Sequence, residues 1–123
     1  MTDPVNKVLM AYAQVWANDD RDGFLDLFAE GASLEDPVGS PAVVGKQALA
    51  EFWDRVHSLG MAYEVEVIRA VSCATQGALV FNVITRGPGV TMKVELVDIF
   101  EIDDAGKIAS MRAFWDQSCM SME

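Results

Sequence analysis

One aspartate of the sequence lies in a short stretch that is rich in turn-forming residues. Asp36 belongs to the segment L-E-D-P-V-G-S-P-A-V-V-G, which runs from Leu34 to Gly45. Pro37 lacks a backbone donor, and it favours an extended conformation for the residue before it. The stretch therefore holds a carboxylate in a restricted conformation. Asp36 is either a turn residue or a carboxylate held rigidly at the mouth of a site.

A second aspartate interrupts an apolar strand face. Between Val90 and Ile102 the even-numbered residues are Val90, Met92, Val94, Leu96, Asp98, Phe100 and Ile102. Successive side chains of a strand point to opposite faces, so we expect this side to face the core or a pocket. An unpaired, ionised carboxylate would be costly there, and such a group usually becomes neutral because its pKa rises. The alternative is a structural aspartate, satisfied by backbone amides or by Arg69, Arg86 or Arg112.

Tyr12 is the third polar group expected on an inward face. It lies between Leu9 and Trp16 on an apolar helical stripe, and a buried tyrosine hydroxyl normally has a partner. An apolar cavity with a few convergent polar groups is typical of a small-molecule site. The sequence has no zinc-ligand spacing, phosphate loop, Ser-His-Asp set or nucleotide fingerprint, and we predict no metal. We interpret His57, the only histidine, as a surface or satisfied residue.

Three helices are predicted in the first half of the chain. Thr2-Asp3-Pro4 supplies an N-cap and an early proline for a helix whose apolar stripe ends at Trp16. A short helix should cover Asp22 to Glu30, with Gly31 ending it, and a third should span Lys46 to Ser58, with Gly60 beyond.

The period changes to two after Tyr63, which indicates strands. We predict them at Tyr63–Ser72, Ala78–Arg86, Val90–Ile102 and Lys107–Asp116, with glycine-containing turns between the last three. Helices followed by a meander of strands predict an α+β fold. The helices should pack on one face of a curved antiparallel sheet.

Length and composition restrict the class of protein. The 123 residues should form a single domain, residues 1–123, and a formal net charge of −10 argues against nucleic acid or an anionic membrane as a partner. No long apolar run or signal peptide is present, so we expect a soluble, cytoplasmic protein. Without a secretion signal, Cys73 and Cys119 should be free thiols.

Four fragments in this order and spacing resemble the bacterial ketosteroid isomerases (steroid Δ-isomerases) of the nuclear-transport-factor-2-like superfamily. They are A-Y-A-Q-V-W, L-E-D-P-V-G-S-P followed by V-V-G-K, V-D-I-F-E-I-D-D-A-G-K-I, and M-R-A-F-W, and they span nearly the whole chain. The resemblance implies a cone-shaped fold, a homodimer, one deep apolar cavity per subunit and no cofactor. It assigns Asp36 as general base, and Tyr12 with a protonated Asp98 as an oxyanion hole, an arrangement already known for ketosteroid isomerases.

The reaction that the resemblance implies converts a 3-oxo-Δ5-steroid to its 3-oxo-Δ4 isomer by proton transfer through a dienolate. The expected substrate-binding residues are Trp16, Phe52, Trp53, Phe81, Val83, Leu96, Met111 and Trp115. One departure concerns the chain of tyrosines that backs the oxyanion tyrosine in the best-studied members. Phe28 and Trp53 occupy the corresponding positions here, so the donor network behind Tyr12 should be shorter.

The sequence leaves two other hypotheses about function open. The first is a terpenoid or polyketide cyclase or hydrolase on the same fold. Epoxide hydrolases of this superfamily use an arginine between two acids, and no arginine here clearly lies on an inward face. The second is a non-catalytic small-molecule-binding dimer, because fold does not determine function. Such a module has no need to combine Asp36, Tyr12 and Asp98 around one cavity.

Overall fold

The computed structural model describes residues 3–122. Within this range the chain forms three helices, namely α1 (Pro4–Ala17), α2 (Arg21–Leu27) and α3 (Lys46–His57). The strands of the same range are β1 (Phe28–Glu35), β2 (Val43–Val44), β3 (Ala62–Cys73), β4 (Gln76–Gly87), β5 (Val90–Ile102), β6 (Ile108–Phe114) and β7 (Met120–Met122). No helix of the described residues has the length and apolar character needed to cross a membrane.

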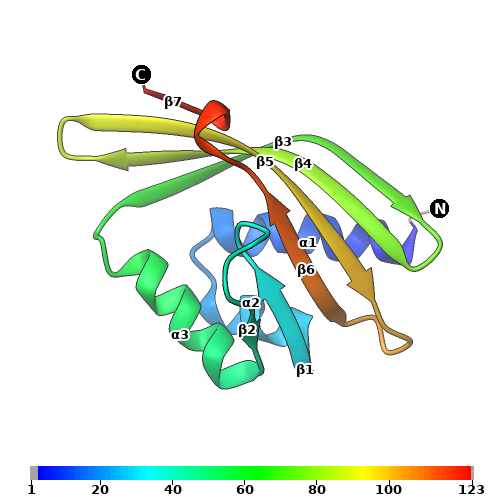
Figure 1. Ribbon diagram of the computed structural model, residues 1–123. Coiled ribbons are helices and arrows are strands. Elements are labelled where there is room, and N and C mark those ends of the chain that lie inside the picture. The colour runs from blue at the N-terminus through cyan, green and yellow to red at the C-terminus, as the bar shows by residue number, and fades with distance from the viewer. Residues whose placement is uncertain (1–2, 123) are drawn as a thin grey trace.

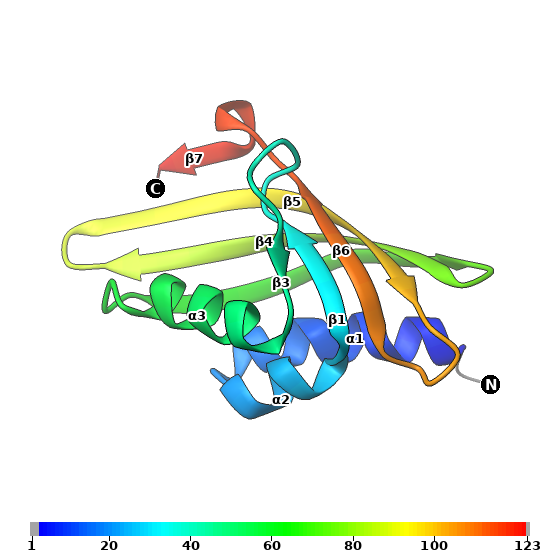
Figure 2. The same cartoon turned by 60° about the horizontal axis from the view of Figure 1, so that its bottom comes forward.

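The strands form one strongly curved, open sheet in the order β2-β1-β6-β5-β4-β3, with β7 added beside β5. The three helices lie on the same face of this sheet, and α1 runs across the long strands (Figures 1 and 2). The predicted α+β architecture is therefore confirmed, with one correction. The sheet is mixed rather than antiparallel, because β1 pairs in parallel with β6.

The boundaries of α1 follow from its sequence. Asp3 is the N-cap, and its carboxylate accepts hydrogen bonds from the amides of Val5 and Asn6, while Pro4 occupies the first turn. Thr2 lies outside the described residues. The apolar stripe of the helix turns Val5, Leu9 and Tyr12 into the core, as the helical spacing predicted.

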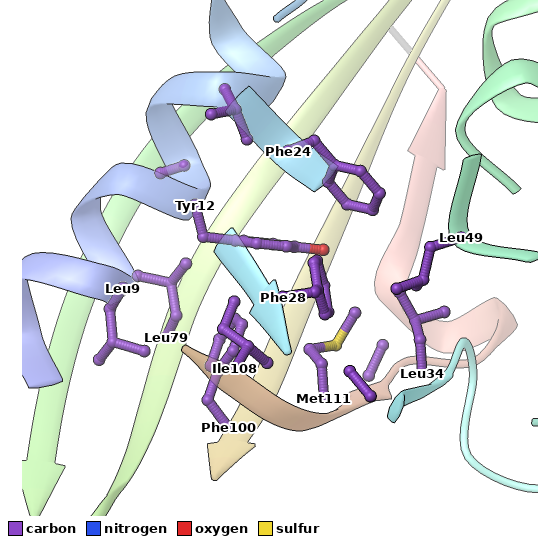
Figure 3. Close-up of a cluster of buried hydrophobic side chains, with 14 of the residues drawn as sticks. Leu9, Tyr12, Phe24, Phe28, Leu34, Leu49, Leu79, Phe100, Ile108 and Met111 are labelled. Atoms are coloured by element: carbon purple, nitrogen blue, oxygen red, sulfur yellow. The ribbon is translucent and has the colours of Figure 1, made fainter. Parts of the chain in front are cut away.

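The core lies between α1, α2 and the inner face of the sheet. Figure 3 shows Tyr12 reaching from α1 into this cluster, near Phe24 of α2 and Phe28 of β1. The Tyr12 ring also meets Phe100 edge-on, at 4.9 Å between centroids. The largest fully buried side chains are Phe24, Phe28, Phe100, Leu9, Leu34, Leu49, Leu79, Ile108, Met111 and Asp98. Aspartate is the one charged residue type in that group.

The second helix is shorter than predicted. It ends at Leu27, and β1 begins at Phe28, so Gly31 lies inside a strand and does not end a helix. The physical reason is packing, since Phe28, Ala32 and Leu34 are buried when this segment joins the sheet beside β6. The short strands β2 and β7 and the 3₁₀ turn Gln117–Cys119 were also not predicted.

The four predicted strands agree with β3 to β6, and β5 has the predicted bounds. Cys73 and Cys119 are free thiols, as expected. His57 is satisfied, since Nδ1 lies 2.8 Å from the carbonyl oxygen of Trp53 and Nε2 lies 3.1 Å from a carboxylate oxygen of Asp19.

Gly77, at the start of β4, allows α1 to lie close to the sheet. A Cβ at this position would stand 2.7 Å from a methyl carbon of Leu9, which is fully buried. Gly77→Ala should therefore lower the free energy of unfolding by about 1–3 kcal/mol, as overpacked cores do. Urea unfolding measures the change.

Gly31→Ala is the matched control, because an added Cβ there meets nothing within 4 Å. It should leave the stability within about 0.5 kcal/mol of wild type or raise it slightly. Equal losses for the two variants would mean that the Leu9 contact does not limit the approach of α1.

Candidate active site

One cavity opens between the inner face of the sheet and the helices. Its volume is about 220 Å³, and its walls are almost entirely apolar. The lining residues are Tyr12, Trp16, Asp36, Phe52, Val56, Tyr63, Phe81, Val83, Met92, Val94, Leu96, Asp98, Trp115 and Met120. The structure thus brings Tyr12, Asp36 and Asp98 to one site from α1, the β1–β2 connection and β5.

Asp36 follows directly after β1 and is held from two sides. The indole Nε1 of Trp115, just beyond β6, donates to its Oδ1 at 2.6 Å. Two residues later, the amide of Val38 donates to the carbonyl oxygen of Ala113 in β6 at 2.8 Å. Burial raises the pKa of Asp36, and the Trp115 hydrogen bond opposes this shift. This arrangement fixes a half-buried carboxylate in an apolar wall while leaving it able to exchange a proton.

Asp98 lies at the middle of the sheet, opposite Leu79 of β4 and Ala113 of β6. Its side chain is 1% exposed, and Oδ1 has no hydrogen-bond partner among the described residues. Burial first, and then the charge of Asp36, raise its pKa well above the ordinary value. The alternative of an aspartate neutralised by arginine is not what the structure shows. Arg86 pairs with Glu64 at 2.7 Å, and no arginine in the described part of the chain lines the cavity.

Tyr12 presents its hydroxyl to the same cavity from α1. Burial is the main cause that raises the pKa of its phenol well above 10, and the charges of Asp98 and Asp36 add to the effect. The Trp16 side chain acts in the opposite direction. Tyr12 is therefore a neutral hydrogen-bond donor at ordinary pH. Tyr12, Asp36 and Asp98 all line this cavity.

The predicted cavity wall agrees in most positions with the observed one. Trp16, Phe52, Phe81, Val83, Leu96 and Trp115 line the cavity, while Trp53 and Met111 do not. These two lie in the core, 3% and 1% exposed, with the Trp53 ring packed 4.5 Å from that of Trp16. Both side chains are buried, and periodicity does not separate a core position from a cavity position.

Five lining residues were not among the predicted substrate-binding residues: Val56, Tyr63, Met92, Val94 and Met120. Met92 and Val94 lie on the alternating face of β5, which already predicted their direction. Met120 reaches the cavity because β7 pairs with β5 opposite Val94, and no sequence pattern indicated that pairing. Within residues 3–122, no group of three or more His, Cys, Asp or Glu side chains is arranged to hold a metal ion.

Comparisons with known proteins show the family to which the chain belongs. The SnoaL-like domain matches residues 9–111 of the chain. A steroid Delta-isomerase of Nocardioides simplex is 34% identical over 115 residues, which cover 94% of this chain and 92% of the relative.

Two solved structures illustrate the shared fold. The epoxide hydrolase/cyclase-like enzyme SalBIII, described in pyran ring formation in the polyether salinomycin, superposes with a TM-score of 0.87 at 23% identity, covering 97% of this chain and 95% of SalBIII. Rv0760c of Mycobacterium tuberculosis, in complex with estradiol-17beta-hemisuccinate, gives 0.84 at 22% identity, with coverage of 98% and 99%. At these identities the two structures establish the fold alone.

The burial of Asp98 has a consequence for stability. The folded protein holds the Asp98 proton more tightly than the unfolded chain, whose pKa is about 3.9. Asp98 therefore makes its full contribution to stability below that pH, and this contribution is lost as pH rises toward the folded pKa. Because asparagine cannot ionise, Asp98→Asn escapes the loss. Urea unfolding should show that the free energy of unfolding of Asp98→Asn rises relative to that of wild type between pH 4.5 and pH 7.5. The expected rise is about 1.4 kcal/mol per pH unit between the unfolded and the folded pKa of Asp98.

Asp54→Asn is a control of opposite sign. Asp54 is exposed, and its hydrogen bonds with Arg21 lower its pKa. The free energy of unfolding of wild type should therefore not fall relative to that of Asp54→Asn as pH rises. A stability gap between wild type and Asp98→Asn that stays constant over the same range would show that Asp98 is ionised in the folded protein.

Proposed function

We propose that this protein, which belongs to the SnoaL-like family, is a steroid Δ-isomerase that converts 3-oxo-Δ5-steroids to 3-oxo-Δ4-steroids. The observation that carries the proposal is the pair of carboxyl groups, one hydrogen-bonded and one without a partner on Oδ1, beside a phenol in an apolar cavity. The steroid Delta-isomerase of Nocardioides simplex, similar over almost its whole length, supports the same activity.

Asp36 is the proposed base. In its ionised form it takes a proton from the carbon between the ketone and the alkene, and the electron pair moves into a dienolate. The resulting carboxylic acid then returns the proton two carbons further along, which regenerates the carboxylate. Its raised pKa supports the first half of this cycle, since a more basic carboxylate accepts the proton more readily. The apolar walls keep the proton from water during the transfer.

Tyr12 and Asp98 are the proposed oxyanion hole. Negative charge develops on the ketone oxygen in the dienolate, and donors fixed at that point stabilise it more than they stabilise the substrate. Tyr12 donates its phenolic proton. Asp98 can donate only when it is protonated, and the apolar surroundings of β5 favour that state. An apolar steroid needs no charged partner, so the acidic surface of the protein does not oppose its binding.

The alternatives have less support. A hydrolase with an arginine between two acids does not fit, because no basic residue among residues 3–122 lines the cavity. A non-catalytic binding protein gains nothing from an unpartnered carboxyl group in its wall, since a buried polar group without a hydrogen bond lowers stability. A cyclase that uses the same acids remains the second candidate, and product analysis separates it from an isomerase.

The homodimer implied by the resemblance is also part of the proposal. The outer face of the sheet carries apolar side chains, among them Phe114, which is 42% exposed and pairs across from Val97 of β5. Light scattering at micromolar concentration should give twice the chain mass. A monomer mass under these conditions would contradict a stable dimer.

Asp36→Asn should remove nearly all isomerase activity, because an amide cannot accept the proton. Loss of positioned proton transfer typically lowers turnover ~10²–10⁴-fold. Absorbance of the conjugated enone after addition of androst-5-ene-3,17-dione measures turnover. Quenching of tryptophan fluorescence measures steroid affinity, which should persist because Trp16 and Trp115 both line the cavity.

Glu35→Gln is the matched control, since Glu35 is the neighbouring carboxylate and does not line the cavity. It should retain turnover close to that of wild type. Activity of Asp36→Asn within tenfold of wild type would place the base elsewhere, and hydrated or cyclised products would favour the second candidate.

A further inference from the structure

The Trp16 indole N–H has no role in the mechanism above, yet it is buried at the cavity. Nε1 is excluded from solvent and forms no hydrogen bond of standard geometry with any described residue. The same is true of Oδ1 of Asp98, which lines the same cavity. A buried N–H without a partner lowers stability, so such groups in native proteins call for a specific explanation. A partner engaged only while substrate is bound is one explanation.

The indole is held in a fixed orientation by its neighbours. Its ring lies 4.5 Å from that of Trp53 and stacks on His57 at 5.5 Å with an interplanar angle of 16°. His57 is itself fixed, because its two ring nitrogens contact the Trp53 carbonyl and Asp19. Phe24 closes a further side, edge-on at 5.5 Å. This packing leaves Trp16 little freedom to turn, and a rigid donor stabilises charge at little cost in entropy.

Trp16 stands one helical turn after Tyr12, so the two side chains project from the same side of α1. Their ring centroids are 6.4 Å apart at 63°, and Trp16 lowers the pKa of the Tyr12 phenol against the larger effect of burial. The phenylalanine neighbours of Tyr12 cannot supply a donor. Phe28 and Phe24, at 6.4 and 6.2 Å, have no polar atom. Trp16 is therefore the nearby side chain whose N–H favours negative charge on the Tyr12 oxygen.

We propose that the Trp16 indole N–H donates to the hydroxyl oxygen of Tyr12 while that hydroxyl donates to the dienolate oxygen. This inference rests on the proposed isomerase function and assigns Trp16 as a positioning residue that acts through Tyr12. As Tyr12 shares its proton with the dienolate, its own oxygen gains negative charge, and a donor to that oxygen strengthens the first hydrogen bond. An indole thus takes the place of a longer chain of hydroxyl groups.

A double-mutant cycle tests this coupling. Trp16→Phe keeps an aromatic ring but removes the N–H, and it should lower kcat on androst-5-ene-3,17-dione about five- to tenfold with little change in KM. Tyr12→Phe alone should lower kcat ~10²–10³-fold. In the presence of Tyr12→Phe, the further effect of Trp16→Phe should shrink to less than about twofold. Equal effects of Trp16→Phe in both backgrounds would overturn the proposal, because they would mean direct donation to substrate or simple packing.

Phe24→Leu controls for packing. Phe24 belongs to the same aromatic cluster, is fully buried and does not line the cavity. Any loss of kcat that it causes by loosening the cluster should be the same with and without Tyr12→Phe. Coupling to Tyr12→Phe as strong as that of Trp16→Phe would show that the cycle reports packing and would overturn the proposal.

Proton NMR of the indole N–H groups gives a readout that needs neither turnover nor a folded Trp16 variant. The chain has three tryptophans, so three indole signals are expected. Tyr12→Phe keeps the ring and removes only the oxygen. With a saturating 3-oxo-Δ4-steroid bound, it should therefore move the Trp16 signal upfield relative to wild type with the same steroid and leave that of Trp53 nearly unchanged. An unmoved Trp16 signal would overturn the proposal. Absence of isomerisation by wild type, with the Trp16 signal shifted as expected, would instead reject the isomerase function.

Discussion

The carboxyl group of Asp98, buried in an apolar wall without an arginine beside it, is the constraint on which the site depends. Removing an aspartate from water favours its neutral form, and the negative charge of Asp36 in the same cavity acts in the same direction. Two carboxyl groups that share a cavity but differ in burial can hold different protonation states at one pH. One of them is then a proton acceptor and the other a donor, which is the pairing that enolate chemistry requires.

A different feature of the fold positions each of the three polar groups of the site. Asp98 is held by strand pairing on both sides, between β4 and β6 in the centre of the sheet. Asp36 lies just beyond the end of β1, which pairs in parallel with β6, and the Trp115 indole donates a hydrogen bond to its Oδ1. Tyr12 comes from α1, which the small residue Gly77 allows to lie close to the sheet. The two donors lie on a helix and a strand, and the base lies on the connection between β1 and β2.

Sequence periodicity was sufficient to find the most informative residue. The alternation along β5 predicted the inward direction of Asp98, and the structure confirms that direction. The sequence did not predict β1, because Gly31 was interpreted as the end of a helix. The segment is a strand because its parallel partner β6, almost eighty residues later, provides the edge that it joins. Long-range pairing of this kind has no local signature.

The sequence also did not predict which inward-facing residues belong to the core and which line the cavity. Trp53 and Met111 have the same inward direction as residues that line the cavity, and only the curvature of the sheet decides which side chains touch one another and which leave a space. The same holds for the aromatic cluster that orients Trp16. Its members come from three helices, and no spacing along the chain brings them together.

The protonation state of Asp98 is the central claim, and infrared spectroscopy measures it directly. The difference spectrum between wild type and Asp98→Asn at pH 7 should contain the carbonyl band of a protonated carboxylic acid. The matching difference spectrum for Asp36→Asn should contain carboxylate bands, because the proposed base must be ionised to accept a proton. Burial raises the pKa of Asp36, and the Trp115 hydrogen bond opposes this shift. Carboxylate bands for Asp98 at pH 7 would contradict the account, because an ionised aspartate cannot donate to the dienolate oxygen.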